Sequence, residues 1–237
     1  MKKTLLTLAA TVATLAATTL PSTALADGLS YNVGAVTDYR YRGISQTRLK
    51  PALQGGVDYS LGGFYAGAWA STIKWVKDGG GKSNYELDLY GGYKGELAKD
   101  LAYDVGLLAY VYPGNKLSPS ANTTELYAAL SYGPLTAKYS HSTGNLFGFA
   151  KSSGSGYLDL SASFEVAGLT VTPHIGHQSV RRNSASSYTD YSLTVAKDFN
   201  GLLVSAALVD TDTNAYVSPN AKNLGKASVV LGAKLNF

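Results

Sequence analysis

Apolar and polar side chains alternate along most of the chain from Asp27 to Phe237, in segments of roughly ten residues. Leu158 and Leu160, for example, flank Asp159. Successive side chains of a β-strand point to opposite faces, so this period of two predicts strands with one apolar and one polar face. No apolar run after residue 26 approaches the roughly eighteen residues that a spanning helix needs. The chain is therefore predicted to be all-β.

The connections between these segments predict how the strands are joined. Short connections such as 62–63 and 133–134 take turns with long, polar ones such as 143–155 and 211–225. This pattern is typical of an up-and-down meander with one tidy end and one elaborate end. Since no linker interrupts it, we expect one domain over residues 27–237. The predicted strands number about twelve, at 29–42, 50–61, 64–76, 84–94, 99–112, 122–132, 135–142, 156–166, 169–179, 188–198, 201–210 and 226–237.

Residues 1–26 have the organisation of a secretory signal peptide. Lys2 and Lys3 precede an apolar stretch at 5–20, and Ala24-Leu25-Ala26 matches a cleavage site. Removing the two lysines lowers the formal net charge from +4 to +2. So small a charge predicts no basic patch and no nucleic-acid partner. The chain contains no Cys, which excludes disulfides and thiol chemistry.

The width of a twelve-stranded barrel indicates which face meets water. About eight strands already enclose as much space as side chains can fill, so apolar residues packed inward would leave a void. With the apolar face outward, lipid covers it, and the closed ring satisfies every backbone hydrogen bond. The predicted fold is a transmembrane antiparallel up-and-down β-barrel with both termini in the periplasm.

The run TDYRYRGISQ, residues 37–46, alternates tyrosine and arginine. We predict that Tyr39 and Tyr41 face lipid, whereas Asp38, Arg40 and Arg42 face the lumen near its external mouth. Two interpretations stay open and are compatible with each other: these charges select ions at a constriction, or they pair with one another and stiffen the wall. The predicted pore-lining charges, of mixed sign with carboxylates more numerous, are Asp38, Arg40, Arg42, Asp58, Lys74, Glu86, Asp88, Asp104, Glu125, Lys138, Asp159 and Glu165.

Aromatic residues on the apolar face are expected to lie at the two membrane interfaces. Tyr65 and Trp75, ten residues apart, would be separated by about 25 Å along the membrane normal, the height of an apolar band. The predicted interface aromatics are Tyr31, Tyr39, Tyr65, Trp75, Tyr85 and Tyr93.

Residues 30–71 also resemble a known family. The runs at 38–47, 51–59 and 64–69 match the D-Y-R-[YF]-R-G-x-S-Q-T, P-A-x-Q-G-G-x-D-Y and aromatic G-x-[WY] elements of the TorF-family porins of proteobacteria. Phe237, at the end of the last apolar series, is similar to the terminal signal read by barrel-assembly machinery. The resemblance implies an outer-membrane channel for small solutes, surrounded by membrane lipid and lipopolysaccharide. It implies no particular substrate.

An enzyme, a metal site and a phosphate-binding loop are each poorly supported. A serine hydrolase needs a histidine near a nucleophile, but His141 and His177 follow the outward face. Only His174 is left, facing the lumen near Ser161 or Ser163 without a G-x-S-x-G elbow. The two histidines of H-x-x-H at 174–177 fall on opposite faces of a strand, which argues against a shared metal ion. No predicted helix follows the glycines at 79–81, which argues against a phosphate-binding loop.

We predict a porin that is not an enzyme and binds no cofactor or metal. The alternative is a closed barrel that displays loops for adhesion or for envelope integrity. Its oligomeric state is left open.

Overall fold

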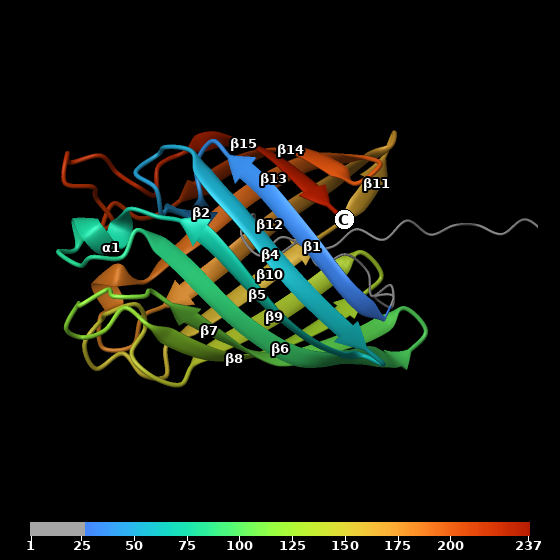
Figure 1. Ribbon diagram of the computed structural model, residues 1–237, viewed down its shortest axis with the longest axis horizontal. Coiled ribbons are helices and arrows are strands. Elements are labelled where there is room, and N and C mark those ends of the chain that lie inside the picture. Colours follow the sequence, from blue (N-terminus) through green and yellow to red (C-terminus); the bar gives the residue numbers. More distant parts are fainter. Residues whose placement is uncertain (1–26) are drawn as a thin grey trace, which may run out of the picture.

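Twelve antiparallel strands form a closed barrel in the computed structural model, which describes residues 27–237 (Figure 1). β1 pairs with β4 on one side and with β15 on the other, and each remaining strand pairs with its neighbours along the chain. β10 and β11 both pair with β12 and act as one strand interrupted at Ser163. The strands are β1 (Gly28–Val36), β4 (Ala52–Leu61), β5 (Phe64–Thr72), β6 (Tyr85–Ala98), β7 (Leu101–Val111), β8 (Thr123–Tyr132), β9 (Leu135–Ser142), β10 (Gly156–Ala162), β11 (Phe164–Val166), β12 (Leu169–Ser179), β13 (Tyr188–Phe199), β14 (Leu202–Thr211) and β15 (Ser228–Asn236).

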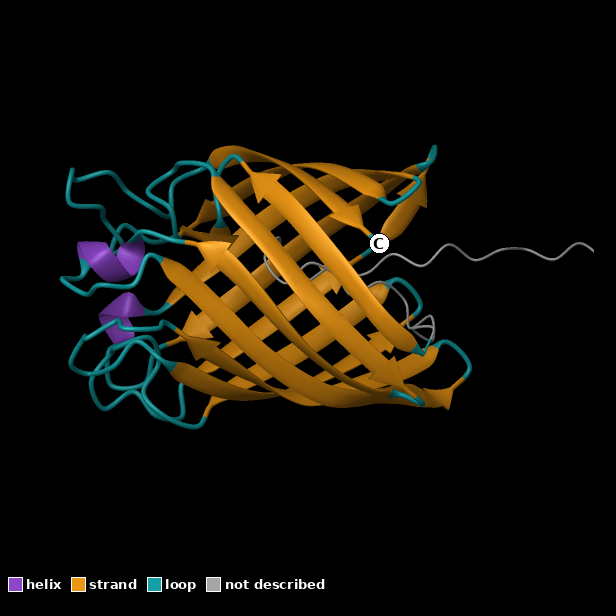
Figure 2. Cartoon of the chain, viewed as in Figure 1, coloured by secondary structure: helices purple, strands orange, loops and turns teal. Residues whose placement is uncertain are grey.

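The two ends of the barrel differ, as the connection lengths predict. The short turns gather at one end together with the start of β1 and the end of β15, and the long loops gather at the other (Figure 2). The long loops contain the helix α1 (Trp75–Asp78), the 3-10 helix η1 (Ser184–Ser186) and a small hairpin of β2 (Arg40–Tyr41) and β3 (Ile44–Ser45). Along residues 27–237, the helices are all too short to cross a membrane.

The barrel wall is apolar outside and polar inside. Leu160 and Leu231 are 44% and 52% exposed on the outer surface, whereas Asp88 and Asp159 are buried in the lumen. A soluble protein does not leave so many large apolar side chains in contact with water. The predicted transmembrane barrel fold, with its apolar face outward, is confirmed. The predicted signal peptide, residues 1–26, lies outside the described residues.

The first predicted strand is wrong beyond Val36, where β1 ends instead of continuing to residue 42. The chain turns into the lumen there and makes a tight turn at Arg42 and Gly43, whose φ angles are 46° and 79°. A side chain at Gly43 would clash, because a Cβ atom would lie 2.4 Å from Thr211 Cγ2 and 2.8 Å from Asp190 Cβ. Glycine therefore lets the turn pack against the inner surface of β13 and β14. The third predicted strand also ends early, since β5 stops at Thr72 and α1 follows.

Candidate functional site: a lumen crossed by a hairpin

Residues 38–47, here named the lumenal hairpin, cross the interior of the barrel near the long-loop end. The backbone of Gln46 donates to the Tyr39 carbonyl at 2.7 Å, which closes the base of the hairpin. The Ser45 amide donates to the Leu224 carbonyl at 2.9 Å, which ties β3 to the loop before β15. From this base the tip reaches side chains of β8, β10 and β12. The hairpin thus crosses the lumen and contacts the barrel wall on both sides.

The Asp38 carboxylate holds the hairpin in shape. One oxygen accepts from Arg40 Nε at 2.5 Å, and the other accepts from the hydroxyls of Ser45 and Thr47 at 2.5 and 3.2 Å. Arg40 also donates to the Gly43 carbonyl and to Ser228 Oγ of β15. Asp38 and Arg40 therefore pair with each other, as one of the two open interpretations holds.

Arg42 at the tip of the hairpin makes the contacts that span the lumen. Its Nη1 and Nη2 donate to the two carboxylate oxygens of Glu125 on β8 at 3.0 and 2.7 Å. Nη1 also donates to Gln178 Oε1 on β12 at 2.6 Å. The guanidinium lies over the Tyr157 ring, 4.1 Å from its centroid. Both side chains of the ion pair are nearly inaccessible to water, at 7% and 3% exposure. This buried bidentate pair therefore holds the hairpin tip to β8.

A histidine flanked by two carboxylates lies behind the Tyr157 ring. The Tyr157 hydroxyl donates to Asp190 Oδ2 at 3.0 Å. His174 Nε2 lies 3.0 Å from Asp159 Oδ2, and its Nδ1 lies 3.6 Å from Asp190 Oδ1. The cluster links β10, β12 and β13 and supports the ring on which Arg42 rests.

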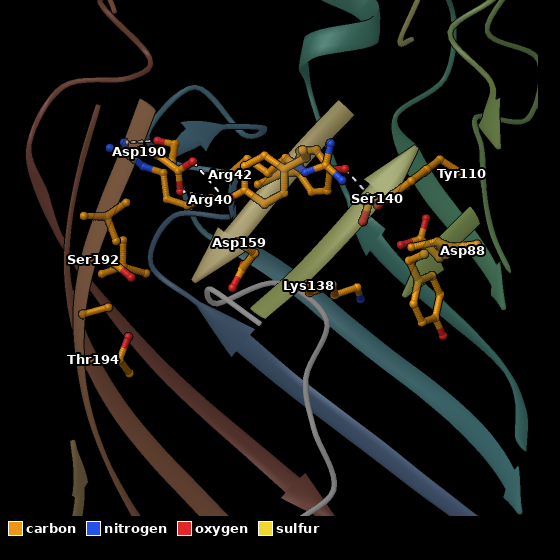
Figure 3. A pocket seen from close by; sticks show the side chains of 18 residues that line it. Arg40, Arg42, Asp88, Tyr110, Lys138, Ser140, Asp159, Asp190, Ser192 and Thr194 are labelled. Carbon is orange, nitrogen blue, oxygen red and sulfur yellow. Dashed lines mark hydrogen bonds between the residues drawn. The ribbon is translucent and has the colours of Figure 1, made fainter. Parts of the chain in front are cut away.

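A cavity of about 130 Å³ lies beneath the hairpin tip (Figure 3). Within the described residues, one carboxylate oxygen of Asp88 and one of Asp159 have no hydrogen-bond partner in the protein. Lys138, which also lines the cavity, places Nζ 4.0 Å from the centroid of the Tyr127 ring. These groups give the cavity several polar partners, and water or a solute could occupy it.

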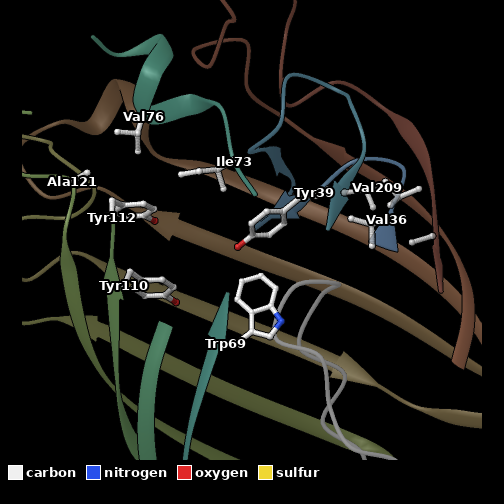
Figure 4. Packing of buried hydrophobic residues seen from close by; sticks show 12 residues of the cluster. Val36, Tyr39, Trp69, Ile73, Val76, Tyr110, Tyr112, Ala121 and Val209 are labelled. Atoms are coloured by element: carbon white, nitrogen blue, oxygen red, sulfur yellow. The ribbon is translucent and has the colours of Figure 1, made fainter. Parts of the chain in front are cut away.

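Apolar side chains fill part of the lumen beside the hairpin (Figure 4). Tyr39 packs edge-on against Trp69 at 5.7 Å, and Ile73 and Val76 are fully buried beside them. The hydroxyls of Tyr39 and Tyr112 both donate to the Glu86 carboxylate. Burial, followed by the charge of Glu86, raises the pKa of Tyr39 well above its usual value, so this hydroxyl stays protonated. Because these packed side chains occupy part of the lumen, its open part is narrow.

Several predicted interface aromatics lie inside the barrel instead. Tyr39 is buried in the lumen because β1 ends before it, and Tyr41 hydrogen-bonds the Tyr110 hydroxyl for the same reason. Tyr65 follows the inward face of β5 and donates to Asp104 Oδ1 at 2.5 Å. Trp75 lies in α1 and packs against Tyr112 at 5.0 Å. Of the predicted interface aromatics, the structure places Tyr31, Tyr85 and Tyr93 on the outer face.

Two predicted pore-lining charges lie outside the lumen. Lys74 is exposed in the loop just before α1, because the chain has already left the barrel at Thr72. Glu165 is exposed at the short-turn rim, where it accepts from Thr170 Oγ1. The structure places the remaining ones in the lumen, either in the hairpin or on the inner wall: Asp38, Arg40, Arg42, Asp58, Glu86, Asp88, Asp104, Glu125, Lys138 and Asp159.

Sequence reasoning missed three lumenal groups that complete the site, Tyr157, Gln178 and Asp190. Each lies on the inner face of a correctly predicted strand. The alternation of β13, in which Asp190 shares a face with Ser192 and Thr194, could have identified the aspartate. Residues 27–237 contain no cluster of three or more His, Cys, Asp or Glu side chains arranged to hold a metal ion.

Comparison with solved structures finds barrels. The NanC porin aligns with a TM-score of 0.55 at 13% identity, over 88% of this chain and 99% of that one. A porin refined at 1.8 Å resolution aligns with a TM-score of 0.40 at 16% identity, over 78% of this chain and 62% of that one. OprD from Pseudomonas aeruginosa aligns with a TM-score of 0.38 at 15% identity, over 89% and 65%. The chain thus spans less than two thirds of the length of the latter two, and the NanC likeness supports the fold alone.

Comparison by sequence gives a family. A family model described as "Bacterial protein of unknown function (Gcw_chp)" matches residues 22–237. No curated protein matches the chain.

Proposed function

The chain belongs to the Gcw_chp family of bacterial proteins, and we propose that it is an outer-membrane channel through which small hydrophilic solutes and ions diffuse passively. One observation carries this proposal: charged and polar side chains line a cavity inside a wall whose outer face is apolar. The likeness to the NanC porin supports the barrel fold. The TorF-like N-terminal runs and the leader-like residues 1–26 support the location and the activity. The long loops would face the exterior and both termini the periplasm.

The lumenal hairpin would set the size of what passes. Solutes entering from the exterior meet the ion pair of Arg42 and Glu125 before they reach the cavity beside Asp88. Because Arg42 donates hydrogen bonds to both Glu125 and Gln178, the ion pair has a defined position. A narrow gap between fixed charges passes small hydrated solutes and excludes larger ones.

The proposal predicts discrete conductance steps when purified protein is added to a planar lipid bilayer. The steps should be small because the hairpin and the apolar cluster fill much of the bore. A heat-induced shift in gel mobility would verify, in the same preparation, that the barrel is folded. Folded protein that leaves the bilayer silent would contradict the channel and favour the closed barrel, an alternative supported by the apolar cluster around Tyr39 and Trp69.

A weak preference for cations is the second expected result. Asp38 and Glu125 neutralise Arg40 and Arg42. Asp88, Asp159 and Asp190 also line the cavity, and Lys138 is the single lysine among its described lining residues. In a gradient of potassium chloride, the reversal potential should therefore have the sign of cation flow. Asp88→Asn should shift it toward zero, whereas Asp212→Asn, at an exposed loop position, should leave it unchanged. A reversal potential that favours chloride would contradict the assignment.

A further inference from the structure

The exposed charges of the protein are separated along the barrel axis. The long-loop end carries ten exposed Lys and Arg side chains and two exposed carboxylates, Asp210 and Asp212. At the short-turn end the balance reverses, with Asp27, Glu96, Asp100, Glu165 and Asp198 against Lys99 and Lys197. The small total charge predicted no basic patch, and this prediction is wrong because folding brings residues from separate loops to one rim.

Six of these basic residues lie close to the top of the barrel wall. Each is two or three positions from the end of a strand: Lys50, Lys74, Lys82, Arg181, Arg182 and Lys226. At about 3.3 Å per residue, this distance places them within roughly 10 Å of the rim. We name these six residues the basic collar. Among the described residues, none of the six forms an ion pair with a carboxylate.

Four of the collar residues form a continuous arc. Lys226 precedes β15, Lys50 precedes β4, and Lys74 and Lys82 lie in the loop that joins β5 to β6 (Figure 1). These strands are neighbours in the sheet order β6-β5-β4-β1-β15. Arg48 and Asp78 form an ion pair that joins the loop after β1 to α1, so the loops carrying Lys50 and Lys74 are linked. The arc therefore follows one side of the barrel rim.

We infer that the basic collar binds the phosphate groups of anionic lipids in the surrounding outer leaflet, that is, the phosphorylated glycolipid of lipopolysaccharide. The height of the collar is the reason for this choice. Charges just above the apolar band lie at the depth of lipid headgroups, where each Lys or Arg adds to the attraction of anionic lipid. A soluble polyanion would be met first by the tips of the loops. The inference rests on the proposed outer-membrane location, but not on channel activity.

The inference is tested by native mass spectrometry of the detergent-solubilised protein titrated with lipid A and with fully dephosphorylated lipid A. Wild type should bind lipid A at least about tenfold more tightly than the dephosphorylated form, since each lysine contributes about fivefold at low salt. The variant Lys50→Gln/Lys74→Gln/Lys82→Gln/Lys226→Gln should lose this preference. Raising the salt from roughly 0.05 M to 0.5 M should weaken binding of lipid A to wild type.

A matched variant at the other end serves as the control. Lys99→Gln/Lys197→Gln also removes exposed lysines and should bind lipid A as wild type does. Equal binding of the two lipids, or unchanged binding by the four-residue variant, would overturn the inference, as would equally tight capture of soluble polyphosphate. The gel-mobility shift verifies folding of each variant. Bilayer conductance of the same four-residue variant separates this result from a failure of the channel proposal.

Discussion

Removal of the lumenal hairpin is expected to increase the single-channel conductance severalfold. Tyr39 and Gln46 are already joined by a backbone hydrogen bond of 2.7 Å, so two glycines can replace residues 40–45 without stretching the loop. The deletion removes Arg40, Arg42 and the tip that packs against Asp190 and Thr211. Because conductance depends most strongly on the narrowest segment of a pore, clearing this segment should have a larger effect than any single substitution.

Planar-bilayer recording compares this deletion with a loop shortened elsewhere. Replacing residues 219–221 by two glycines shortens the exposed loop before β15, where Ser218 and Lys222 are already joined by a backbone hydrogen bond of 2.9 Å. That variant should conduct as wild type does. Equal conductance in all three proteins would show that the constriction lies elsewhere in the lumen.

Arg42→Met is expected to lower the free energy of unfolding by about 3–5 kcal/mol, the usual cost of removing one partner of a buried ion pair. The loss arises because Glu125, 3% exposed, keeps its charge with only the Tyr110 hydroxyl, at 3.3 Å, still bonded to it. Gln178 also loses the donor to its Oε1. The second change Glu125→Gln, which removes the unpaired charge, should restore more than half of this stability.

Urea titration of the folded barrel, followed by tryptophan fluorescence, measures this effect. The two tryptophans, Trp69 and Trp75, both lie in the long-loop half near the hairpin, so the signal reports on this region. Arg48→Met is the matched control, since Arg48 pairs with Asp78 on the surface and solvent screens that pair. A loss no greater than that of the control would indicate that water, rather than Arg42, solvates Glu125.

The placement of the candidate site was predictable only in part. The alternation along β6 assigned Glu86 and Asp88 to the lumen, because a strand sends neighbouring residues to opposite faces. The same reasoning failed for Tyr39 and Tyr41, which alternate like strand residues but lie in a hairpin. It failed for Tyr65 because small alanines and large aromatics alternate in β5 and both faces look apolar. The structure shows the Tyr65 ring lying over Gly92, a space that one strand alone does not reveal.

The sequence by itself determined the number of strands, their outward faces and the two unequal ends, because these features follow from local periodicity and from turn residues. Tertiary structure alone decided that residues 38–47 turn inward, since that choice depends on partners more than eighty positions away, such as Glu125 and Gln178. It also decided the basic collar, since β1 pairs with both β4 and β15 and so brings the strands that follow Lys50 and Lys226 to its two sides. Contacts between distant segments cost chain entropy and are stabilised only in the closed ring, so no local pattern encodes them.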